Sequence, residues 1–198
     1  MTLSDVMLFI SFTMNNILIK FDDGTPITLE QMLLAKERRV QNQQNAINLY
    51  HYPLISLSLV IPGPIKNSSG ANRLFKEAIT AIHKALSKNA IPLVHESHFH
   101  NITGYEAIIS AKCSADTLKQ CCIDIEDNHP LGRLWDIDVI DPITQQSISR
   151  AKFDHPSRQC LICQDIAKIC SRSKKHTIDE IFSAIENKMK DYFGVSVR

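Results

Sequence analysis

The sequence lacks a strong net charge, a long hydrophobic run and a basic start. Its formal net charge is only +1 at pH 7, so the broadly basic surface of a duplex-binding protein is missing and no nucleic-acid partner is expected. The apolar run at residues 7–12 is too short to span a bilayer, and no Lys or Arg precedes it as in a signal peptide. These absences predict a cytoplasmic protein with no membrane partner.

The chain has 198 residues, enough to bury one good core with a small appendage. It contains six cysteines but no convincing secretory signal, which indicates a reducing compartment. In such a compartment thiols serve as core residues or metal ligands rather than as disulfides. We expect residues 1–22 to form an N-terminal extension, residues 23–154 the main domain, and residues 155–198 a Cys/His-rich segment packed on that domain.

Asp136 and Asp138 alternate with apolar residues in the stretch 129–141. Side chains of a strand alternate between its faces, so the two carboxylates project from one face and the apolar residues between them from the other. Neighbouring carboxylates repel unless a cation neutralises them, and hard oxygen ligands suit a Mg²⁺ ion that bridges substrate phosphates. The pattern predicts a metal-assisted phosphoryl or nucleotidyl transfer site, although plain surface strands also show Asp in alternation.

The residues just before this strand strengthen the prediction. Pro130 ends the preceding helix, Gly132 lets a backbone come close, and Arg133 supplies a fixed cation beside the carboxylates. The catalytic candidates in this stretch are Asp136, Asp138, His129 and Arg133, with Gly132 as a substrate-binding candidate.

A second candidate site is the loop at residues 62–70. It is rich in Gly, Ser and Asn, carries Lys66, and leads into a helix with Arg73 in its first turn. Backbone N–H groups at a helix N-terminus attract anions, so the loop has the parts of an anion cradle. It lacks the Walker A sequence, and an ordinary N-capped loop has the same composition. The substrate-binding candidates here are Gly63, Lys66, Asn67, Ser68 and Arg73.

The order of the expected elements defines a fold class. Thr28 and Gln31 form a capping box that opens a long N-terminal helix. Residues 53–141 follow as strand, helix, strand, strand, helix, strand, which is the ferredoxin-like βαββαβ plan of an α+β protein. We expect the first and last strands side by side in the centre of an antiparallel sheet, so that Lys66 and the two aspartates face one pocket. A nucleotidyltransferase-like α/β sheet is the alternative, and a short strand is expected at residues 147–153.

The C-terminal segment contains the ligand set of a closed zinc site. Cys160 and Cys163 are spaced as Cys-x-x-Cys, and Cys170 and His176 follow within one short segment. Three thiolates and one imidazole suit tetrahedral zinc. The competing interpretation is a set of reduced thiols packed under a tail, with the basic residues around Arg172 simply solvated.

Four blocks of the sequence match the pattern of a known family. They are Thr28-Leu29-Glu30-Gln31-Met32-Leu33, Ile61-Pro62-Gly63-Pro64-Ile65-Lys66-Asn67, His129-Pro130-Leu131-Gly132-Arg133-Leu134-Trp135-Asp136-Ile137-Asp138-Val139, and Arg158-Gln159-Cys160-Leu161-Ile162-Cys163 with Ala167-Lys168-Ile169-Cys170-Ser171-Arg172-Ser173-Lys174-Lys175-His176. With these blocks the chain resembles the apo-citrate lyase phosphoribosyl-dephospho-CoA transferases, or holo-citrate lyase acyl carrier protein synthases. The likeness covers about residue 23 to the end; the preceding residues look additional, and Ser171 stands where Ala is more usual.

The resemblance implies a reaction and its partners. The phosphoribosyl-dephospho-CoA group would pass from triphosphoribosyl-dephospho-CoA to a serine of the acyl carrier (gamma) subunit of apo-citrate lyase, with release of diphosphate. Residues 23–154 would then be the catalytic transferase domain. Two alternatives remain open, namely the same transfer to a malonate decarboxylase carrier, or a non-catalytic zinc-stabilised binding module.

The resemblance also implies roles for the candidate residues. Mg²⁺ on Asp136 and Asp138 would lie where charge develops on the phosphates and the departing diphosphate. One of these aspartates, or His129, would take the serine proton. The remaining phosphates would be held by Arg133, Lys66 and Arg172.

Overall fold

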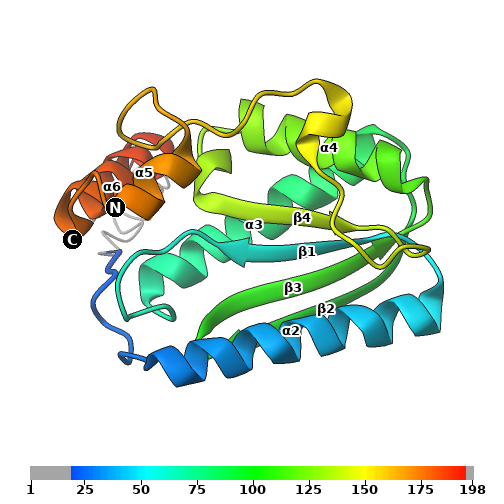
Figure 1. The fold of residues 1–198 in the computed structure, drawn as a ribbon, viewed down its shortest axis with the longest axis horizontal. Coiled ribbons are helices and arrows are strands. Elements are labelled where there is room, and N and C mark those ends of the chain that lie inside the picture. The colour runs from blue at the N-terminus through cyan, green and yellow to red at the C-terminus, as the bar shows by residue number, and fades with distance from the viewer. Residues whose placement is uncertain (1–18, 195–198) are drawn as a thin grey trace, which may run out of the picture.

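The computed structural model describes residues 19–194, and the expected N-terminal extension lies outside the described residues up to residue 18. The described chain forms a four-stranded sheet with helices on both faces (Figure 1). The elements are α2 (Leu29–Tyr50), β1 (Leu54–Leu59), α3 (Ser69–Lys88), β2 (Leu93–Asn101), β3 (Gly104–Ala111), α4 (Ala115–Asn128), the 3₁₀ helix η1 (Gly132–Leu134), β4 (Trp135–Ile140), the 3₁₀ helix η2 (Arg150–Phe153), α5 (Ala167–Ser173) and α6 (Ile178–Phe193).

The sheet has the strand order β2-β3-β1-β4, and every neighbouring pair is antiparallel. This is the ferredoxin-like α+β plan predicted from the element order. β1 pairs with β4 as expected, but the expectation that both strands lie in the centre was wrong, because β4 forms an edge of the described sheet. In this plan one strand is inserted between the two strands of each βαβ unit. β1 is inserted between β3 and β4, which leaves β4 outside.

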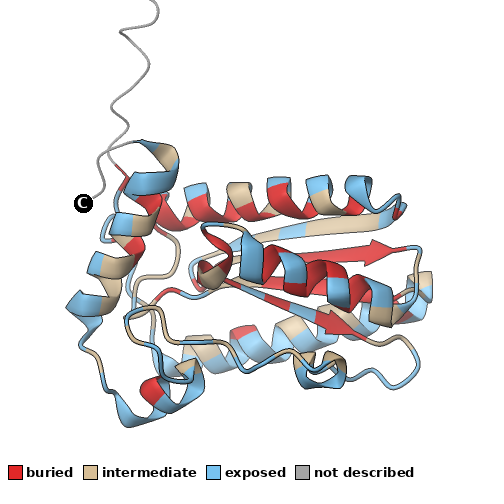
Figure 2. Cartoon of the chain, turned by 90° about the horizontal axis from the view of Figure 1, so that it is seen from above, coloured by how far each residue is buried: buried red, intermediate tan, exposed pale blue. Residues whose placement is uncertain are grey.

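The alternation of side chains along the strands separates two layers of packing. Ile55 and Leu57 of β1 belong to the main core, which is shared with α3 and α4. Leu54, on the opposite face, packs with Ala46 and Ile47 of α2. Figures 1 and 2 show the same division, with α2 covering one face of the sheet and α3 and α4 the other. The period of two in the strand sequence therefore determines which helix each residue contacts.

The two layers differ in polarity. α3 shows a continuous buried stripe toward the sheet, whereas α2 buries only three residues along its length (Figure 2). Polar pairs occupy part of the space beneath α2, where Arg39 contacts Glu106 at 2.6 Å and Gln43 donates to the Ser56 hydroxyl at 2.8 Å. Buried polar groups are stable only when they are hydrogen-bonded, as these are. The α2 side of the sheet is thus a partly polar face on which a site can be built.

The segment after β4 differs from the expected secondary structure. The predicted strand at residues 147–153 is wrong, because a single bridge joins Ser147 to Ile140 and the 3₁₀ helix η2 follows. The Ser149 side chain accepts a hydrogen bond from Ala151 N at 3.2 Å and so caps that helix. Because Ser149 caps a helix, the extended backbone ends there and does not continue to residue 153 as predicted.

The C-terminal helix α6 packs on the same core as α3 and α4. Ile185 and Met189 of α6 are fully buried in it, and the Arg73 guanidinium of α3 lies 4.6 Å from the ring centre of Phe193. Phe21, which precedes α2, is also buried there. The boundaries proposed at residues 22 and 154 stay predictions. Among residues 19–194, every helix is too short or too polar to span a lipid bilayer.

Candidate active site and metal cluster

Asp136 and Asp138 project from one face of β4, as their spacing predicts. The apolar residues that alternate with them, including Trp135, are buried in the main core. The two carboxylates are exposed and stand opposite Ser58 and Ser56 of β1, respectively. Because the other face of the strand is anchored in the core, the backbone holds both carboxylates on the α2 side of the sheet.

A cation that the sequence analysis did not assign lies against this pair. Arg158 Nη1 donates to Asp136 Oδ1 at 3.3 Å, and its Nη2 donates to the Trp135 carbonyl oxygen at 2.6 Å. Although about half of the Asp136 side chain is exposed, with 51% accessible, the protein atoms packed around its carboxyl group remove water and raise its pKa above the usual value. The charge of Asp138 raises it further, while Arg158 and Arg39 act in the opposite sense. The protein's own cations therefore neutralise the pair only in part, a condition that favours a bound divalent cation.

The chemistry of the pair fits Mg²⁺. This ion prefers oxygen ligands and is commonly held by one or two carboxylates, with water and substrate phosphates completing its octahedron. Asp136 and Asp138 offer two carboxylates on one face, and Asp138 Oδ1 accepts a hydrogen bond from the Ser147 hydroxyl at 3.0 Å. These two residues could hold the ion, with Ser147 orienting one of them.

α4 fixes the position of β4 through two buried charged side chains. Glu126 Oε1 accepts a hydrogen bond from Ile137 N at 3.2 Å, and Lys119 Nζ donates to the Ile137 carbonyl oxygen at 3.5 Å. Glu126 also contacts Arg158 Nη1 at 3.4 Å. An edge strand otherwise leaves such backbone groups unpaired. α4 therefore closes this edge and holds Arg158 beside the carboxylates.

Lys66 lies on the same side of the sheet as the carboxylates. It lines a cavity of about 110 Å³ together with Arg39 and Ser58, and Ser58 is the residue paired with Asp136. Its ammonium group donates to the Ile61 carbonyl oxygen, and burial lowers its pKa. The fold thus brings Lys66 and the aspartates to one face of the sheet. The two carboxylates do not line the cavity that contains Lys66, so the single pocket expected for all three residues stays a prediction.

The other polar residues of this loop have structural contacts. Asn67 Oδ1 accepts a hydrogen bond from Thr25 N at 3.2 Å. Ser68 is the buried N-cap of α3 and accepts from Ala71 N at 3.2 Å. Gly63 has a φ of +70°, a conformation that favours glycine. These contacts explain why the loop has its shape, and a substrate role for the three residues stays a prediction.

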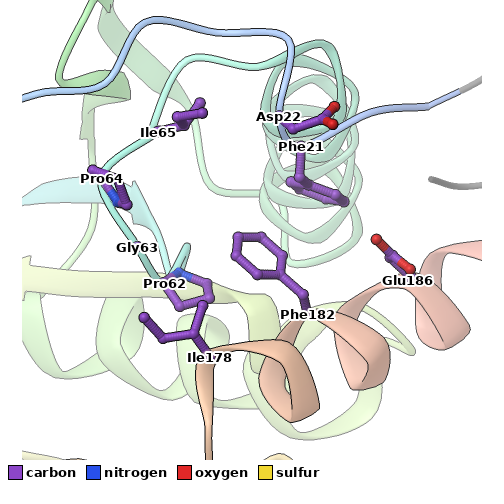
Figure 3. Close-up of a pocket in the computed structure, with 9 residues that line it drawn as sticks. All are labelled: Phe21, Asp22, Pro62, Gly63, Pro64, Ile65, Ile178, Phe182 and Glu186. Atoms are coloured by element: carbon purple, nitrogen blue, oxygen red, sulfur yellow. The ribbon is translucent and has the colours of Figure 1, made fainter.

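Gly63 also lines an apolar pocket of about 260 Å³ between the loop and α6 (Figure 3). Phe21 and Phe182 lie beside each other in its wall, with ring centres 5.8 Å apart. The charged residues that line it are Asp22 and Glu186, both acidic. A wall of apolar and acidic side chains repels polyphosphate, so we do not assign this pocket to the phosphates.

Arg133 lies in a different cavity, of about 340 Å³, beside α4 and α6. Burial lowers the pKa of its guanidinium, and the positive charge of Arg158 lowers it further. Gly132, just before it, approaches α4 so closely that a Cβ atom would lie 2.5 Å from the Ile125 carbonyl oxygen. The close backbone approach expected at Gly132 is therefore observed, and it positions Arg133.

Three further candidates lie away from the carboxylate pair. His129 packs on Trp135 with ring centres 4.5 Å apart, on the side of the sheet that α3 and α4 cover. Its Nδ1 accepts a hydrogen bond from Leu131 N at 3.1 Å. Burial lowers the pKa of His129. Arg73 contacts α6, and Arg172 is exposed on α5. The roles assigned to these three residues stay predictions that their positions do not favour.

Cys160, Cys163, Cys170 and His176 form one cluster, as their spacing predicts. Their ligand atoms all lie within 4.8 Å of one another, with Cys163 Sγ 3.5 Å from Cys170 Sγ and 3.3 Å from His176 Nε2. A tetrahedral site with Zn–S bonds of ~2.3 Å places neighbouring ligand atoms ~3.8 Å apart. The cluster therefore has the size and the donor set to bind a metal ion.

The backbone around Cys160 supports a thiolate ligand. Ile162 N donates to Cys160 Sγ at 3.5 Å, and Cys160 N donates to the Asp165 carbonyl oxygen at 2.7 Å. Although burial alone would raise it, hydrogen bonds from the amides of Cys163 and Ile162 lower the pKa of Cys160 to about 7. Burial and its hydrogen bonds to the other thiols raise the pKa of Cys170 to about 12. At least one sulfur is thus prepared for metal binding near neutral pH.

Sequence reasoning missed Arg158, Arg39 and Ser58 as parts of this face. Arg158 lies 22 residues from Asp136, so only the fold brings them together. One indication of its importance was present in the sequence. Arg158 lies in one of the four blocks that resemble the family, two residues before Cys160. Arg39 belongs to a polar stretch of α2 that, in sequence, looks like a solvated helix face.

The fold and the site together define an α+β protein whose sheet edge carries paired carboxylates and cations suited to phosphates, with a Cys₃His cluster beside it. A family model for apo-citrate lyase phosphoribosyl-dephospho-CoA transferase matches residues 27–192 of this chain. The chain belongs to this family.

Individual relatives bear the same name, apo-citrate lyase phosphoribosyl-dephospho-CoA transferase. A protein from Escherichia coli O7:K1 is 32% identical over 86% of this chain and 93% of its own length. One from Escherichia coli O1:K1 is 31% identical over 92% of this chain and 99% of its own length. A Shigella boydii protein is 32% identical, with coverages of 86% and 93%. The similarity therefore spans nearly all the described elements.

Proposed function

We propose that this protein transfers the phosphoribosyl-dephospho-CoA group from triphosphoribosyl-dephospho-CoA to a serine of the apo-citrate lyase acyl carrier (gamma) subunit, releasing diphosphate. The observation that carries the proposal is the convergence of family membership over residues 27–192 with a carboxylate pair beside Arg158. The relatives are named for a transferase of this group that acts on apo-citrate lyase.

The reaction is a displacement at the phosphorus nearest the ribose. The serine oxygen forms a bond to that phosphorus while the bond to the bridging oxygen of the diphosphate breaks, and the electron pair of that bond leaves with the diphosphate. The serine proton passes to a base. Stabilisation of the charge on the phosphate oxygens is the main task of the protein in such a transfer.

Asp136 and Asp138 would hold the Mg²⁺ expected for this reaction. Bound there, Mg²⁺ would supply positive charge where the non-bridging oxygens and the departing diphosphate become more negative. The base would be one of these two carboxylates, because both lie on the exposed face of the strand on which the ion would bind. His129 is a weaker candidate, since it packs on the opposite side of β4, against Trp135.

The cations around the pair would orient the substrate. Lys66 and Arg39 line the cavity next to Ser58, and Arg158 contacts Asp136 directly. An arginine can bind phosphate oxygens through two parallel N–H donors, which fixes orientation as well as charge. We therefore assign phosphate binding to these three residues, while Arg172, exposed on α5, has no comparable support.

Zinc in the Cys160, Cys163, Cys170 and His176 cluster would be structural. A site with four protein ligands is closed and leaves no position for substrate. It would instead fix the segment that carries Arg158, two residues before Cys160. Zinc binding would then contribute to the stability of the C-terminal segment.

The test is a transfer assay. Purified protein is mixed with Mg²⁺, triphosphoribosyl-dephospho-CoA and apo acyl carrier subunit, and the carrier is weighed by mass spectrometry. We expect the mass of one phosphoribosyl-dephospho-CoA group with the wild type, less than a hundredth of that rate with Asp136→Asn, and the wild-type rate with Asp191→Asn, a matched change at an exposed aspartate of α6.

Each alternative predicts a different result of the same assay. If only a malonate decarboxylase carrier gained mass, that carrier and not the citrate lyase subunit would be the acceptor. No gain on either carrier, with metal bound at the cysteine cluster, would favour a non-catalytic zinc-stabilised binding module. Full activity in Asp136→Asn would overturn the role of the carboxylate pair.

A further inference from the structure

The cavity that contains Arg133 is lined mainly by cationic and polar side chains. Arg133 comes from η1, Arg150 from η2, Arg158 from the segment before the cysteine cluster, and Lys188 from α6. Asp127 is the acidic residue in its lining. Four parts of the chain thus bring four cationic residues and one acidic residue to the lining of a space of about 340 Å³.

Two of these guanidinium groups are held in fixed positions. Arg150 Nη2 donates to both carboxylate oxygens of Asp127, at 2.7 and 2.6 Å. Arg158 is held by the Trp135 carbonyl oxygen and by Glu126. The cations are therefore positioned before any ligand arrives, which reduces the entropy lost on binding.

Arg133 and Lys188 supply charge in excess of these pairs. The described residues show no ion pair for either side chain. Burial lowers the pKa of Arg133, the charges of Arg158 and Arg150 lower it further, and the carboxylates of Glu126 and Asp127 act in the opposite sense. A guanidinium remains charged despite such a shift, so the four cationic side chains of the lining outnumber its single carboxylate, an arrangement that favours a bound anion.

One side chain links the cavity to the carboxylate pair. Arg158 lines the cavity and also contacts Asp136 Oδ1 at 3.3 Å. A ligand held at Asp136 that also contacted Arg158 would be next to the cations of this cavity. A polyphosphate chain has this extended shape, with negative charge on each phosphate group.

We propose that Arg133, Arg150, Arg158 and Lys188 form a diphosphate subsite, which holds the two terminal phosphates of the substrate and then the released diphosphate. The proposal rests on the proposed function, because only a triphosphate substrate needs such a site beside the carboxylates. In this arrangement the phosphate that is attacked lies at Asp136. The two phosphates that leave lie in the cavity lined by Arg133, Arg150 and Lys188, on the other side of Arg158.

The shape of the site favours diphosphate over an acidic surface of the carrier. The cations converge on a concave space whose guanidinium groups match the oxygens of a small anion. A docking surface for an acidic protein would instead present its charges outward over a wider area.

The test measures binding of inorganic diphosphate by isothermal titration calorimetry. The protein is used with its metal cluster intact, in buffer without Mg²⁺, so that the carboxylate pair cannot contribute through a bridging ion. We expect Lys188→Gln and Arg133→Gln each to raise the dissociation constant about tenfold. Lys190→Gln is the matched control, because it removes the same charge from an exposed position of the same helix and should leave binding unchanged.

The outcomes separate this proposal from the proposed function. Wild-type diphosphate affinity in both cavity variants would overturn the subsite even if the carrier is modified normally. Diphosphate binding that Lys188→Gln weakens, with no transfer to any carrier, would overturn the function and leave an anion site. Weaker carrier binding in Lys188→Gln with unchanged diphosphate affinity would show a protein-docking surface and overturn the subsite.

Discussion

Arg158 donates a hydrogen bond to Asp136 at 3.3 Å, and this contact joins the C-terminal segment to the edge strand of the sheet. The same guanidinium donates to the carbonyl oxygen of Trp135 at 2.6 Å. Its position is therefore determined by the backbone of β4 as well as by the carboxylate. An ammonium group cannot reproduce this planar set of donors.

Arg158→Lys tests this contact. We expect at least a tenfold lower transfer rate, because the lysine keeps the charge but not the directed hydrogen bonds. The free energy of unfolding should also fall by about 1–3 kcal/mol, since the backbone of β4 loses a buried donor. Carrier mass spectrometry and urea unfolding measure the two effects. Arg38→Lys, at an exposed position of α2, should change neither, and equal loss in both variants would contradict the assignment.

Mg²⁺ binding at the carboxylate pair can be measured without the reaction. An ion that binds only the folded protein raises its stability, by about 1.4 kcal/mol at ten times the dissociation constant. We expect Mg²⁺ to raise the melting temperature of the wild type and of Asp191→Asn but not of Asp136→Asn or Asp138→Asn. Equal stabilisation of all four proteins would place the ion elsewhere.

The cysteine cluster predicts one zinc ion per chain in protein purified without chelator. His176→Ala and Cys163→Ser should lower the zinc content, because each removes one of four ligands. Cys113→Ser, outside the cluster, should keep the metal. Elemental analysis by mass spectrometry provides the measurement. A folded wild type that contains no zinc would end this assignment.

Gly132 should tolerate no side chain. A Cβ atom there would lie 2.5 Å from the Ile125 carbonyl oxygen and 2.6 Å from that of Glu126, and both are backbone atoms that cannot rotate away. We expect Gly132→Ala to lower the free energy of unfolding by about 1–3 kcal/mol, as measured by urea titration. Gly194→Ala, where a Cβ atom would meet open space, should cost only the ~1 kcal/mol of a left-handed backbone.

His129 gives the stability a defined dependence on pH. Burial lowers its pKa in the folded protein, Lys84 of α3 acts in the same sense, and Glu77 of α3 opposes them. The unfolded chain binds a proton near pH ~6.5. Between the lowered pKa and that value the unfolded state holds more protons, so the free energy of unfolding falls as the pH drops below ~6.5.

His129→Asn should therefore lose less stability than the wild type between about pH 7.5 and about pH 5.5. Asparagine can still accept the hydrogen bond from Leu131 N, but it lacks the ring that packs on Trp135, so its stability near neutral pH should be lower by ~1 kcal/mol. Urea unfolding followed by circular dichroism measures both. His51→Asn, at an exposed position, should keep the wild-type pH dependence, and identical profiles for all three proteins would refute the role of burial.

Local patterns in the sequence predicted much of the fold. The capping box at Thr28 opens α2, and the alternation around Asp136 gives β4 one buried and one exposed face. The cysteine and histidine spacing predicted the cluster, because all four ligands lie within one short segment. These features depend on residues near one another in the chain, where periodicity and propensity act directly.

The remaining features depend on tertiary contacts. Arg158 reaches Asp136 only because the segment after η2 returns to β4. The four cations of the diphosphate subsite come from separate elements, and no spacing in the sequence relates them. His129 was predicted to belong to the site because it is close to the aspartates in sequence. Its ring instead packs on Trp135, on the buried face of the strand.

A single residue, Gln159, separates Arg158 from Cys160. Zinc bound in the cluster would hold in place the arginine that contacts Asp136, although the metal itself would not contact the substrate. The proposed transfer would then depend on whether the cluster is loaded with zinc.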